Sequence, residues 1–394
     1  MPKAMYTQEV YLATNSDYAG TDQYVLTNAG VEIPTDITIA SLNGVALTIT
    51  DGKLPDITMD YYKIFGNYGR SREIYMNIYA GDTVIANKKA EQTPLTLIIK
   101  TAAGAMEFTN LLVCTDVIQE AADLNRFSVT YYSNVQDEYT YTNNGYYVMT
   151  DNINAEGLGF KHKNNTYGDY RRFVGTFDGR GYTISNLDLD QAEVGKTGNT
   201  ETFGLFGNLL GADILNVGFV NVSAEAGSVL GSQTNYISTG DCNEGHFTHS
   251  QYIFPHIDGQ AYASTRVENV YIQVSNSVKS MKGALCPGMS GVNFLKNVVI
   301  EWNPTEATAL SSGFGSFIGS GTFTDAEKPK RENVIVLSSV ALNNSLTSCT
   351  GVAVFTDRAT MESSNTASLE GFGAYWTTAS NAPVWNTANW QSNQ

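Results

Sequence analysis

Charged residues, histidines and cysteines are scarce in this chain of 394 residues. Only 16% of the residues are charged, and 39 Asp and Glu outnumber 23 Lys and Arg to give a net charge of −16. Binding to nucleic acid or to an anionic membrane depends on clustered Lys and Arg. The composition therefore argues against nucleic acid and against a membrane as partners.

Long apolar runs are also missing. No stretch approaches the roughly 18 apolar residues that a membrane-spanning helix needs. The opening MPKAMYTQEV has neither the apolar segment nor the cleavage site of a secretory leader, so we expect no export by a leader. The four cysteines show no CxxC spacing, and we expect them to be reduced.

A short phrase centred on asparagine recurs five times in the chain. The first and third positions after the Asn are apolar in every copy, which is the alternation of a strand with one buried face. Four of the copies also have an apolar residue two positions before the Asn. This residue and the first one after the Asn are three positions apart, which breaks the alternation of a strand, so the chain must change direction at or beside the Asn. Asn tolerates the left-handed backbone of such a corner. Amides on stacked corners can form a hydrogen-bonded ladder. The five residues are Asn186, Asn216, Asn269, Asn297 and Asn333.

A second phrase, glycine beside a short apolar run, follows four of these asparagines. Glycine allows backbones to approach closely and marks bends, so this phrase predicts a second strand in each coil. Both phrases fit a parallel β-helix, which is a stack of repeated coils. The copies are residues 204–207, 283–285, 315–319 and 351–355.

One region carries a more specific resemblance. The run Phe173-Val-Gly-Thr-Phe-Asp-Gly-Arg-Gly-Tyr-Thr-Ile-Ser-Asn-Leu187, followed by Gly204-Leu-Phe-Gly207 and Ile214-Leu-Asn-Val-Gly218, resembles the GLUG-type right-handed parallel β-helix repeats of bacterial surface proteins. The resemblance covers about residues 113 to 390 and weakens toward the C-terminus. It implies a scaffold found in adhesins, surface-anchored enzymes and phage fibres, and so it implies fold more narrowly than function.

The predicted organisation is all-β. Short alternating runs separated by turn residues predict a sandwich over residues 31–112 that resembles bacterial Ig-like domains. Residues 1–30 are expected to be an arm or an added edge strand. The β-helix is predicted over 113–394, with a helical cap at 113–126, a loop insertion at 223–261 and a C-terminal cap at 371–394.

The insertion concentrates two kinds of side chain. Its cysteine and histidines could hold Zn²⁺, which takes four such ligands. The alternative is that they lie in a solvated loop and bind no metal. The other kind is aromatic, as expected where a loop stacks on sugars or packs against a partner. The candidate metal ligands are Cys242, His246, His249 and His256. The candidate contact residues are Tyr236, Phe247, Tyr252, Phe254 and Tyr262.

Evidence for an enzyme is limited to one pair of carboxylates. Asp188 and Asp190 are expected to point outward from the same strand, at a separation that glycoside cleavage accepts. The equivalent positions on later coils become apolar, which predicts that they are covered. The cover is either the C-terminal tail, with Trp376, Trp385 and Trp390, or another subunit in a trimeric fibre.

These features favour a non-enzymatic structural and adhesive protein, with no catalytic residue and no cofactor. The expected setting is a bacteriophage virion assembled in the host cytoplasm, where the protein is a head or tail fibre or a decoration protein. Its expected partners are host surface glycan, other virion proteins and further copies of itself. The alternatives are a tailspike-like polysaccharide depolymerase and a bacterial cell-surface adhesin without its leader.

Overall fold

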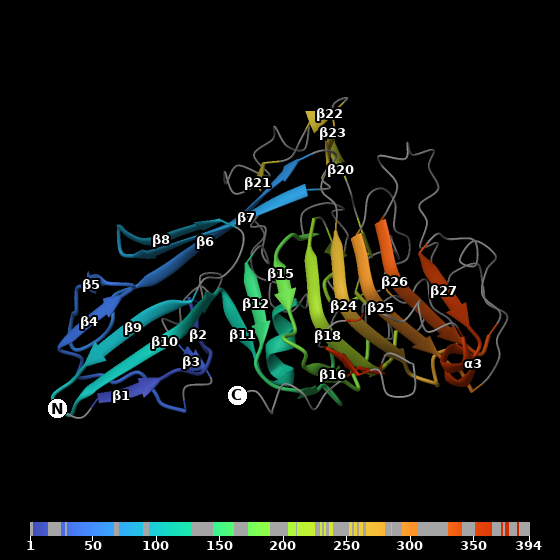
Figure 1. Ribbon diagram of the computed structural model, residues 1–394, viewed down its shortest axis with the longest axis horizontal. Helices are drawn as coiled ribbons and strands as arrows, with labels where there is room; N and C mark the ends of the chain where they lie inside the picture. Colours follow the sequence, from blue (N-terminus) through green and yellow to red (C-terminus); the bar gives the residue numbers. More distant parts are fainter. Residues whose placement is uncertain are drawn as a thin grey trace.

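The computed structural model shows two β-rich parts lying side by side, the first formed by the chain up to Cys114 (Figure 1). Among the described residues every element is a strand apart from two short helices, so the prediction of an all-β fold is confirmed. The structure describes residues 3–14, 25–27, 30–66, 71–89, 94–127, 145–160, 172–189, 204–209, 211–224, 229–230, 232–233, 236–238, 252–253, 256–257, 260–262, 265–279, 285, 294–305, 330–340, 351–364, 372, 375–377 and 384–385.

The larger sheet of the N-terminal part has seven strands in the order β3-β2-β10-β9-β4-β5, with β1 also paired to β10. Its strands bury alternate side chains, as Leu95, Leu97 and Ile99 do along β9. The strands are β1 (Lys3–Tyr6), β2 (Val10–Ala13), β3 (Val25–Thr27), β4 (Ile39–Leu42), β5 (Val45–Leu47), β9 (Leu95–Lys100) and β10 (Ala105–Cys114).

The described part of residues 1–30 pairs within its own chain. Strands β1 and β2 lie one after the other along β10, and both run parallel to it. All four residues of β2 are buried. These residues therefore extend the sheet of their own chain, as an added edge strand would.

A second sheet of four strands, in the order β21-β6-β7-β8, packs against the first. Ile57, Met59 and Ile78 from this sheet share one core with Leu97 and Phe108 of the larger sheet. The strand β21 comes from far along the chain and pairs in parallel with β6. The strands are β6 (Ile57–Gly66), β7 (Ser71–Ala80), β8 (Thr83–Lys89) and β21 (Tyr252–Ile253).

From Asp116 onward, parallel strands stack in the order in which they occur in the chain, and we call this arrangement the parallel stack. Val217, Val270, Val298 and Val334 lie side by side in register, so one repeat position forms one row. Strands β13 and β16 continue the sheet beside β18. The strands are β11 (Asp116–Ile118), β12 (Tyr146–Met149), β13 (Ile153–Asn154), β15 (Thr176–Asp178), β16 (Thr183–Ser185), β18 (Asp213–Val222), β24 (Arg266–Val274), β25 (Phe294–Trp302), β26 (Lys330–Ser338) and β27 (Val352–Phe355).

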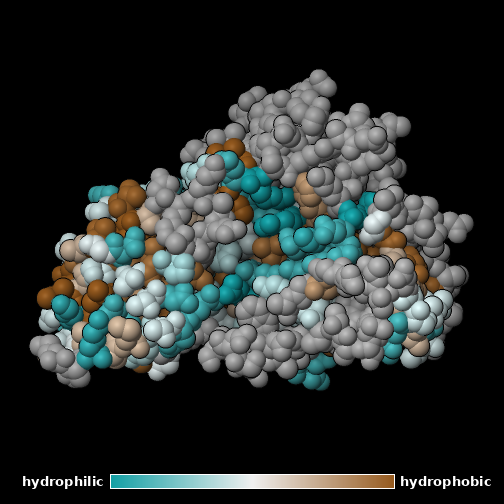
Figure 2. Space-filling view, viewed as in Figure 1, coloured by the Kyte–Doolittle hydropathy of each residue, from teal (hydrophilic) through white to brown (hydrophobic). Residues whose placement is uncertain are grey.

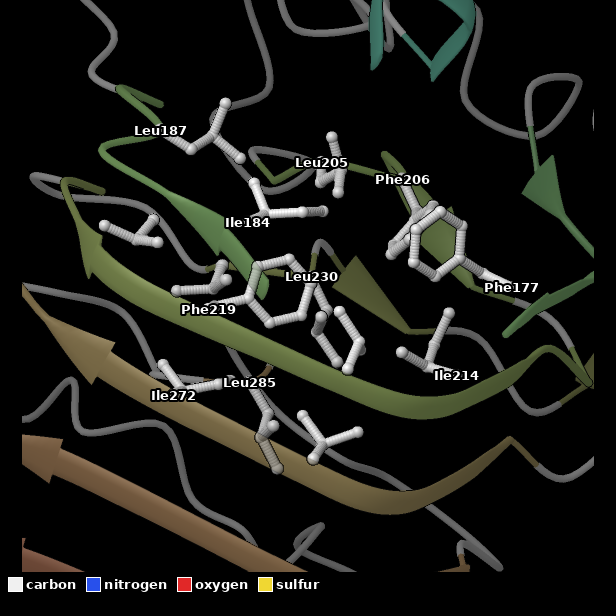
Figure 3. Close-up of a cluster of buried hydrophobic side chains, with 14 of the residues drawn as sticks. Phe177, Ile184, Leu187, Leu205, Phe206, Ile214, Phe219, Leu230, Ile272 and Leu285 are labelled. Atoms are coloured by element: carbon white, nitrogen blue, oxygen red, sulfur yellow. The ribbon is translucent and has the colours of Figure 1, made fainter. Parts of the chain in front are cut away.

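A second, shorter row of parallel strands contributes to the same core. Phe177 and Phe206 approach from the two rows with ring centroids 5.3 Å apart. Figure 3 shows these rings together with Phe219 and Leu230 pointing toward one another inside the stack. The strands of the shorter row are β14 (Arg172–Phe173), β17 (Asn208–Leu209) and β19 (Ser232–Gln233).

The glycine phrase at 204–207 forms a turn directly before β17 of this row. The backbone N–H of Phe206 donates to the carbonyl of Leu230 at 2.9 Å, and the N–H of Leu230 donates to the carbonyl of Leu285 at 3.0 Å. Three coils are thus joined by backbone hydrogen bonds at this phrase.

The glycine phrase at 351–355 does not supply a second strand, so that prediction is wrong. Residues Val352–Phe355 form β27, which pairs with β26 in the main sheet. A Cβ at Gly351 would meet the carbonyl oxygen of Arg331 at 2.3 Å, so this glycine lets two main-sheet segments approach closely. The phrase at 315–319 lies outside the described residues.

A short 3-10 helix, Ala121–Phe127, lies at the start of the stack. The helical cap predicted over residues 113–126 begins later than expected, because Asp116–Ile118 pairs with β12 as a strand. The carboxylate of Asp123 accepts hydrogen bonds from the N–H groups of Gln119 and Glu120, each at 2.9 Å. These bonds hold the chain in a turn just before the helix.

Phe127 at the end of this helix closes the core of the first coils. Its ring centroid lies 5.4 Å from that of Tyr147, 5.8 Å from Phe173, 5.7 Å from Phe177 and 5.0 Å from Phe206, in edge-to-face contacts. Such contacts add to the stabilisation from apolar burial. The helix therefore caps the open end of the stack by packing the ring of Phe127 against its core.

The outer face of the stack is apolar toward its C-terminal end and is covered by the chain's own tail. Val299 and Ile335, at outward positions, are only 0% and 1% exposed. Trp376 and Trp385 pack over them from the hairpin formed by β28 (Trp376–Thr377) and β29 (Val384–Trp385). The tail thus covers the described part of this row, and Trp390 lies outside the described residues.

The helix α3 (Arg358–Ser363) follows β27 and contributes to the same cover. Asp357 caps it by accepting a hydrogen bond from the N–H of Thr360 at 2.7 Å. The side chain of Met361 is fully buried in the cluster that contains both tryptophans. Its position ties the last described strand of the stack to the tail.

Exposed apolar side chains are scattered over the N-terminal part. Figure 2 shows hydrophobic residues mixed with polar ones there, and hydrophilic residues along the middle of this face. Met5, Ile39 and Val84 are the large apolar residues with more than half of their surface exposed among the described positions. No helix in the described ranges is both long enough and apolar enough to cross a bilayer.

Candidate functional site

Four of the five repeat asparagines form one hydrogen-bonded line, which we call the asparagine column. The Nδ2 atom of Asn269 donates to Oδ1 of Asn216 at 2.9 Å. Asn297 donates in the same way to Asn269, and Asn333 to Asn297, each at 3.0 Å. The column ends on Asp178, whose Oδ1 accepts from Asn216 at 2.9 Å. Every amide inside the column therefore both donates and accepts.

Asn186 stands in a second column, so the prediction that all five asparagines align is wrong for this residue. Its amide donates to Asn154 at 2.9 Å and accepts from Asn221 at 2.7 Å. The reason lies in the corners of β18, which has Asn216 at one corner and Asn221 at the next. On the preceding coil Asp178 pairs with Leu215, just before the first corner, and Asn186 lies beside Asn221 at the second.

All six corner asparagines have a left-handed backbone. Their φ angles lie between 54° and 56°. Asn accepts this conformation more readily than other residues with a side chain, because its short amide can bond to nearby groups. The residues are Asn186, Asn216, Asn221, Asn269, Asn297 and Asn333.

A buried cluster of charged groups joins the N-terminal part to the stack, and we call it the Asp213 cluster. The fully buried carboxylate of Asp213 accepts from Nζ of Lys63 at 2.8 Å, Nη1 of Arg72 at 2.5 Å and Nε of Arg266 at 3.0 Å. Thr176 also donates to it at 3.2 Å. Lys63 and Arg72 belong to β6 and β7, so these ion pairs cross the boundary between the two parts.

Lys63 makes further contacts across the same boundary. Its Nζ donates to the carbonyls of Gly175 at 2.9 Å and Gly211 at 3.0 Å. Burial lowers the pKa of Lys63 to about 7, although the charge of Asp213 acts in the opposite direction. Burial also opposes ionisation of Asp213, but its three cationic neighbours prevail and hold the pKa of that carboxyl well below its usual range.

Sequence reasoning missed the Asp213 cluster entirely. Asp213 lies immediately before a repeat phrase and Arg266 occupies the paired position on the next coil, a link that only the strand register reveals. The partners Lys63 and Arg72 come from a different part of the chain. One signal in the sequence could have indicated the cluster. Lys63 falls at an inward position of β6, where a buried lysine requires an acidic partner.

The insertion forms a small antiparallel sheet, which we call the crest, and one strand that docks on the N-terminal part. The crest projects beyond the stack in Figure 1, and Tyr236 pairs with Tyr262 within it. Tyr252 lies in β21, opposite Lys63 of β6. Phe247 and Phe254 lie outside the described residues. The crest strands are β20 (Tyr236–Ser238), β22 (His256–Ile257) and β23 (Gln260–Tyr262).

The candidate metal ligands are only partly described. His256 lies in β22, opposite Ala261 of β23. Cys242, His246 and His249 fall outside the described residues. Within the described ranges, no three side chains of Cys, His, Asp or Glu come together in a way that could hold a metal ion.

Asp188 is exposed at the outer face of the stack, between the buried side chains of Leu187 and Leu189. Its backbone forms a parallel bridge with Ser223 on the following coil. Asp190, the second carboxylate of the predicted pair, lies outside the described residues. The described geometry therefore supplies one carboxylate of the two that glycoside cleavage requires.

Fold and site together define an all-β protein in which a long parallel stack is joined to a two-sheet N-terminal part. No protein-family model matches the chain, and no solved structure matches it. Halomucin of Haloquadratum walsbyi is 36% identical over an alignment of 98 residues, and the match covers 22% of this chain and 1% of that protein. The similarity thus spans a very small part of Halomucin.

Proposed function

We propose that this protein is a non-enzymatic structural and adhesive component of a bacteriophage virion, such as a head or tail fibre or a decoration protein. The parallel stack would be a right-handed β-helix of the GLUG type, preceded by an Ig-like domain. In this role the stack is a stiff support, and its loops contact host surface glycan or neighbouring virion proteins.

One observation supports the proposal most directly: the polar side chains of the stack bond to other groups of the same chain. The asparagine column bonds to itself, and Asp213 is surrounded by cations of its own chain. Hydrogen bonds and ion pairs of this kind stabilise a rigid fold. Such use of polar groups suits a support more than a reaction centre.

The crest supports the adhesive half of the proposal. It extends beyond the stack, and the neighbouring strand β21 anchors the insertion to β6. Tyrosines, of which Tyr236 and Tyr262 are paired here, combine a large apolar ring with a polar hydroxyl. A displayed loop with such residues is suited to contact sugars or another protein.

Binding of the whole chain to host cells, before and after periodate oxidation of their surface glycans, tests this function. We expect binding that oxidation removes, or a stable complex with virion proteins encoded beside this gene. We also expect no reducing sugar to appear when the chain is incubated with host polysaccharide. Release of reducing sugar, or the absence of both kinds of binding, would overturn the proposal.

A further inference from the structure

The hairpin formed by β6 and β7 has two faces of different character. Inward positions such as Ile57, Met59 and Ile78 are buried in the core. The alternate positions point to solvent, because successive side chains of a strand face opposite sides of the sheet. These outward residues are Thr58, Asp60, Tyr62 and Ile64 on β6, and Glu73, Tyr75, Asn77 and Tyr79 on β7.

Two tyrosines at the centre of the outward face stack on one another. Tyr62 and Tyr75 are directly opposite in register, their ring centroids are 4.8 Å apart and their planes differ by 3°. Both side chains remain partly exposed. The hydroxyl of Tyr75 also donates to Oε2 of Glu73 at 2.8 Å. The rings are thus held in place before any ligand arrives, which reduces the entropy lost on binding.

Polar groups flank this pair along the hairpin. Tyr79 lies on this face two residues from Asn77, which pairs with Asp60. Partial desolvation and the neighbouring Asp60 raise the pKa of Tyr79. The face therefore offers aromatic rings together with carboxylate and amide groups.

We infer that the outward face of the β6–β7 hairpin binds a neutral glycan, with Tyr62 and Tyr75 as the stacking platform and Asp60 and Glu73 as acceptors for sugar hydroxyls. Sugar rings have apolar C–H faces that pack on aromatic rings, and their hydroxyls donate to carboxylates in charge-assisted hydrogen bonds. This combination matches a polyhydroxylated ring more closely than an apolar partner.

The charge of this face determines which glycan it accepts. None of the outward residues of β6 and β7 is Lys or Arg, and two are carboxylates, which outnumber Lys89 of the neighbouring strand β8, paired opposite Tyr75. The chain as a whole carries a net charge of −16. Acidic polysaccharides are therefore repelled, whereas neutral hexoses and N-acetylhexosamines are not.

This inference rests on the adhesive function proposed above, and it assigns the sugar contact to the hairpin. The test uses the full-length protein on an array of neutral hexose and N-acetylhexosamine oligosaccharides, with uronic-acid oligosaccharides as the charged comparison. We expect neutral glycans to bind and acidic ones to remain unbound. Tyr62→Ala and Tyr75→Ala should each weaken neutral binding roughly tenfold.

Three further variants control the experiment. Tyr62→Phe keeps the ring and should bind like the wild type, and Ile39→Ala, at an exposed position of the larger N-terminal sheet, should also leave binding unchanged. Asp60→Asn alters an exposed side chain, so it should weaken binding several-fold without affecting the fold. This variant keeps the test decisive if an alanine variant loses thermal stability.

The outcomes separate this inference from the function on which it rests. If neutral glycan binds equally well to Tyr62→Ala, Tyr75→Ala and Asp60→Asn, the hairpin is not the site, and the adhesive role stands. If the chain binds virion proteins but no glycan, the hairpin inference is wrong and the structural role stands. Preferential binding of acidic glycans would also overturn the inference.

Discussion

Gly218 of β18 lies directly against the indole ring of Trp385. A Cβ built at Gly218 would stand 2.5 Å from Nε1 of that ring. The same Nε1 donates to the hydroxyl of Thr183 at 3.2 Å. The tail therefore docks at Gly218, where the absence of a side chain leaves room for the indole ring. The hydroxyl of Thr183, on the preceding coil, fixes the orientation of this ring.

Replacing Gly218 with Ala should destabilise the protein. The added methyl group overlaps a rigid ring, and overpacking of this kind costs about 1 to 3 kcal/mol. Urea unfolding followed by tryptophan fluorescence measures the loss. The same substitution in a Trp385→Leu background should cost less, because the rigid ring is gone. An equal cost in both backgrounds would show that the contact is unimportant.

Asn269 in the middle of the asparagine column should respond differently to Ala and to Gly. Asn269→Ala removes two amide hydrogen bonds and places a Cβ-bearing residue at a φ of 54°, for an expected cost of about 2 to 4 kcal/mol. Asn269→Gly removes the same bonds but accepts the backbone, so it should cost less. Chemical denaturation of both variants gives the difference, and identical losses would contradict the role assigned to the corner.

The negative charge of Asp213 should be essential for holding the N-terminal part against the parallel stack. Asp213→Asn preserves the shape but leaves Lys63, Arg72 and Arg266 without their carboxylate, and uncompensated buried charge costs about 3 to 5 kcal/mol. Asp188→Asn is the matched control, since its carboxylate is exposed and its loss should change stability by less than about 0.5 kcal/mol. Similar melting temperatures for the two variants would refute this account.

Lys63 should make stability depend on pH in the weakly alkaline range. Its pKa is about 7 in the folded protein, against an ordinary value of 10.5 for lysine, so between these two pH values the unfolded chain binds one more proton than the folded chain. The free energy of unfolding should then rise with pH from about 7 toward 10. Lys63→Met removes the titrating group, so the free energy of unfolding, measured by chemical denaturation between about pH 6.5 and 9, should rise less steeply with pH for this variant. Parallel pH profiles for wild type and variant would exclude the effect.

Much of the stack was accessible to sequence reasoning because its signals are local. The apolar positions after each Asn are buried, as Val270 and Ile272 are after Asn269. The left-handed corners follow from the chemistry of Asn itself. The cover of Trp376 over Val299 could also be anticipated, since an apolar outward row requires one.

The errors concern relations between distant segments. The phrase around Asn186 matches that around Asn216, yet the two residues stand in different columns, because a strand with two corners offers two places for such a phrase. The ion pairs of Asp213 with Lys63 and Arg72 were also invisible, since nothing local to Asp213 indicates its partners. Both relations depend on how the strands of different coils are aligned with one another and with the N-terminal part.

The sequence by itself determined which residues form strands, which side chains are buried and where the chain turns, because periodicity and backbone tolerance act within a few residues. Tertiary structure alone decided which corners share a column, which strand Asp213 faces and where the tail docks on Gly218. The physical reason is that coils of similar pattern can stack in several registers. The choice among them depends on the lengths of the intervening segments and on contacts with the N-terminal part.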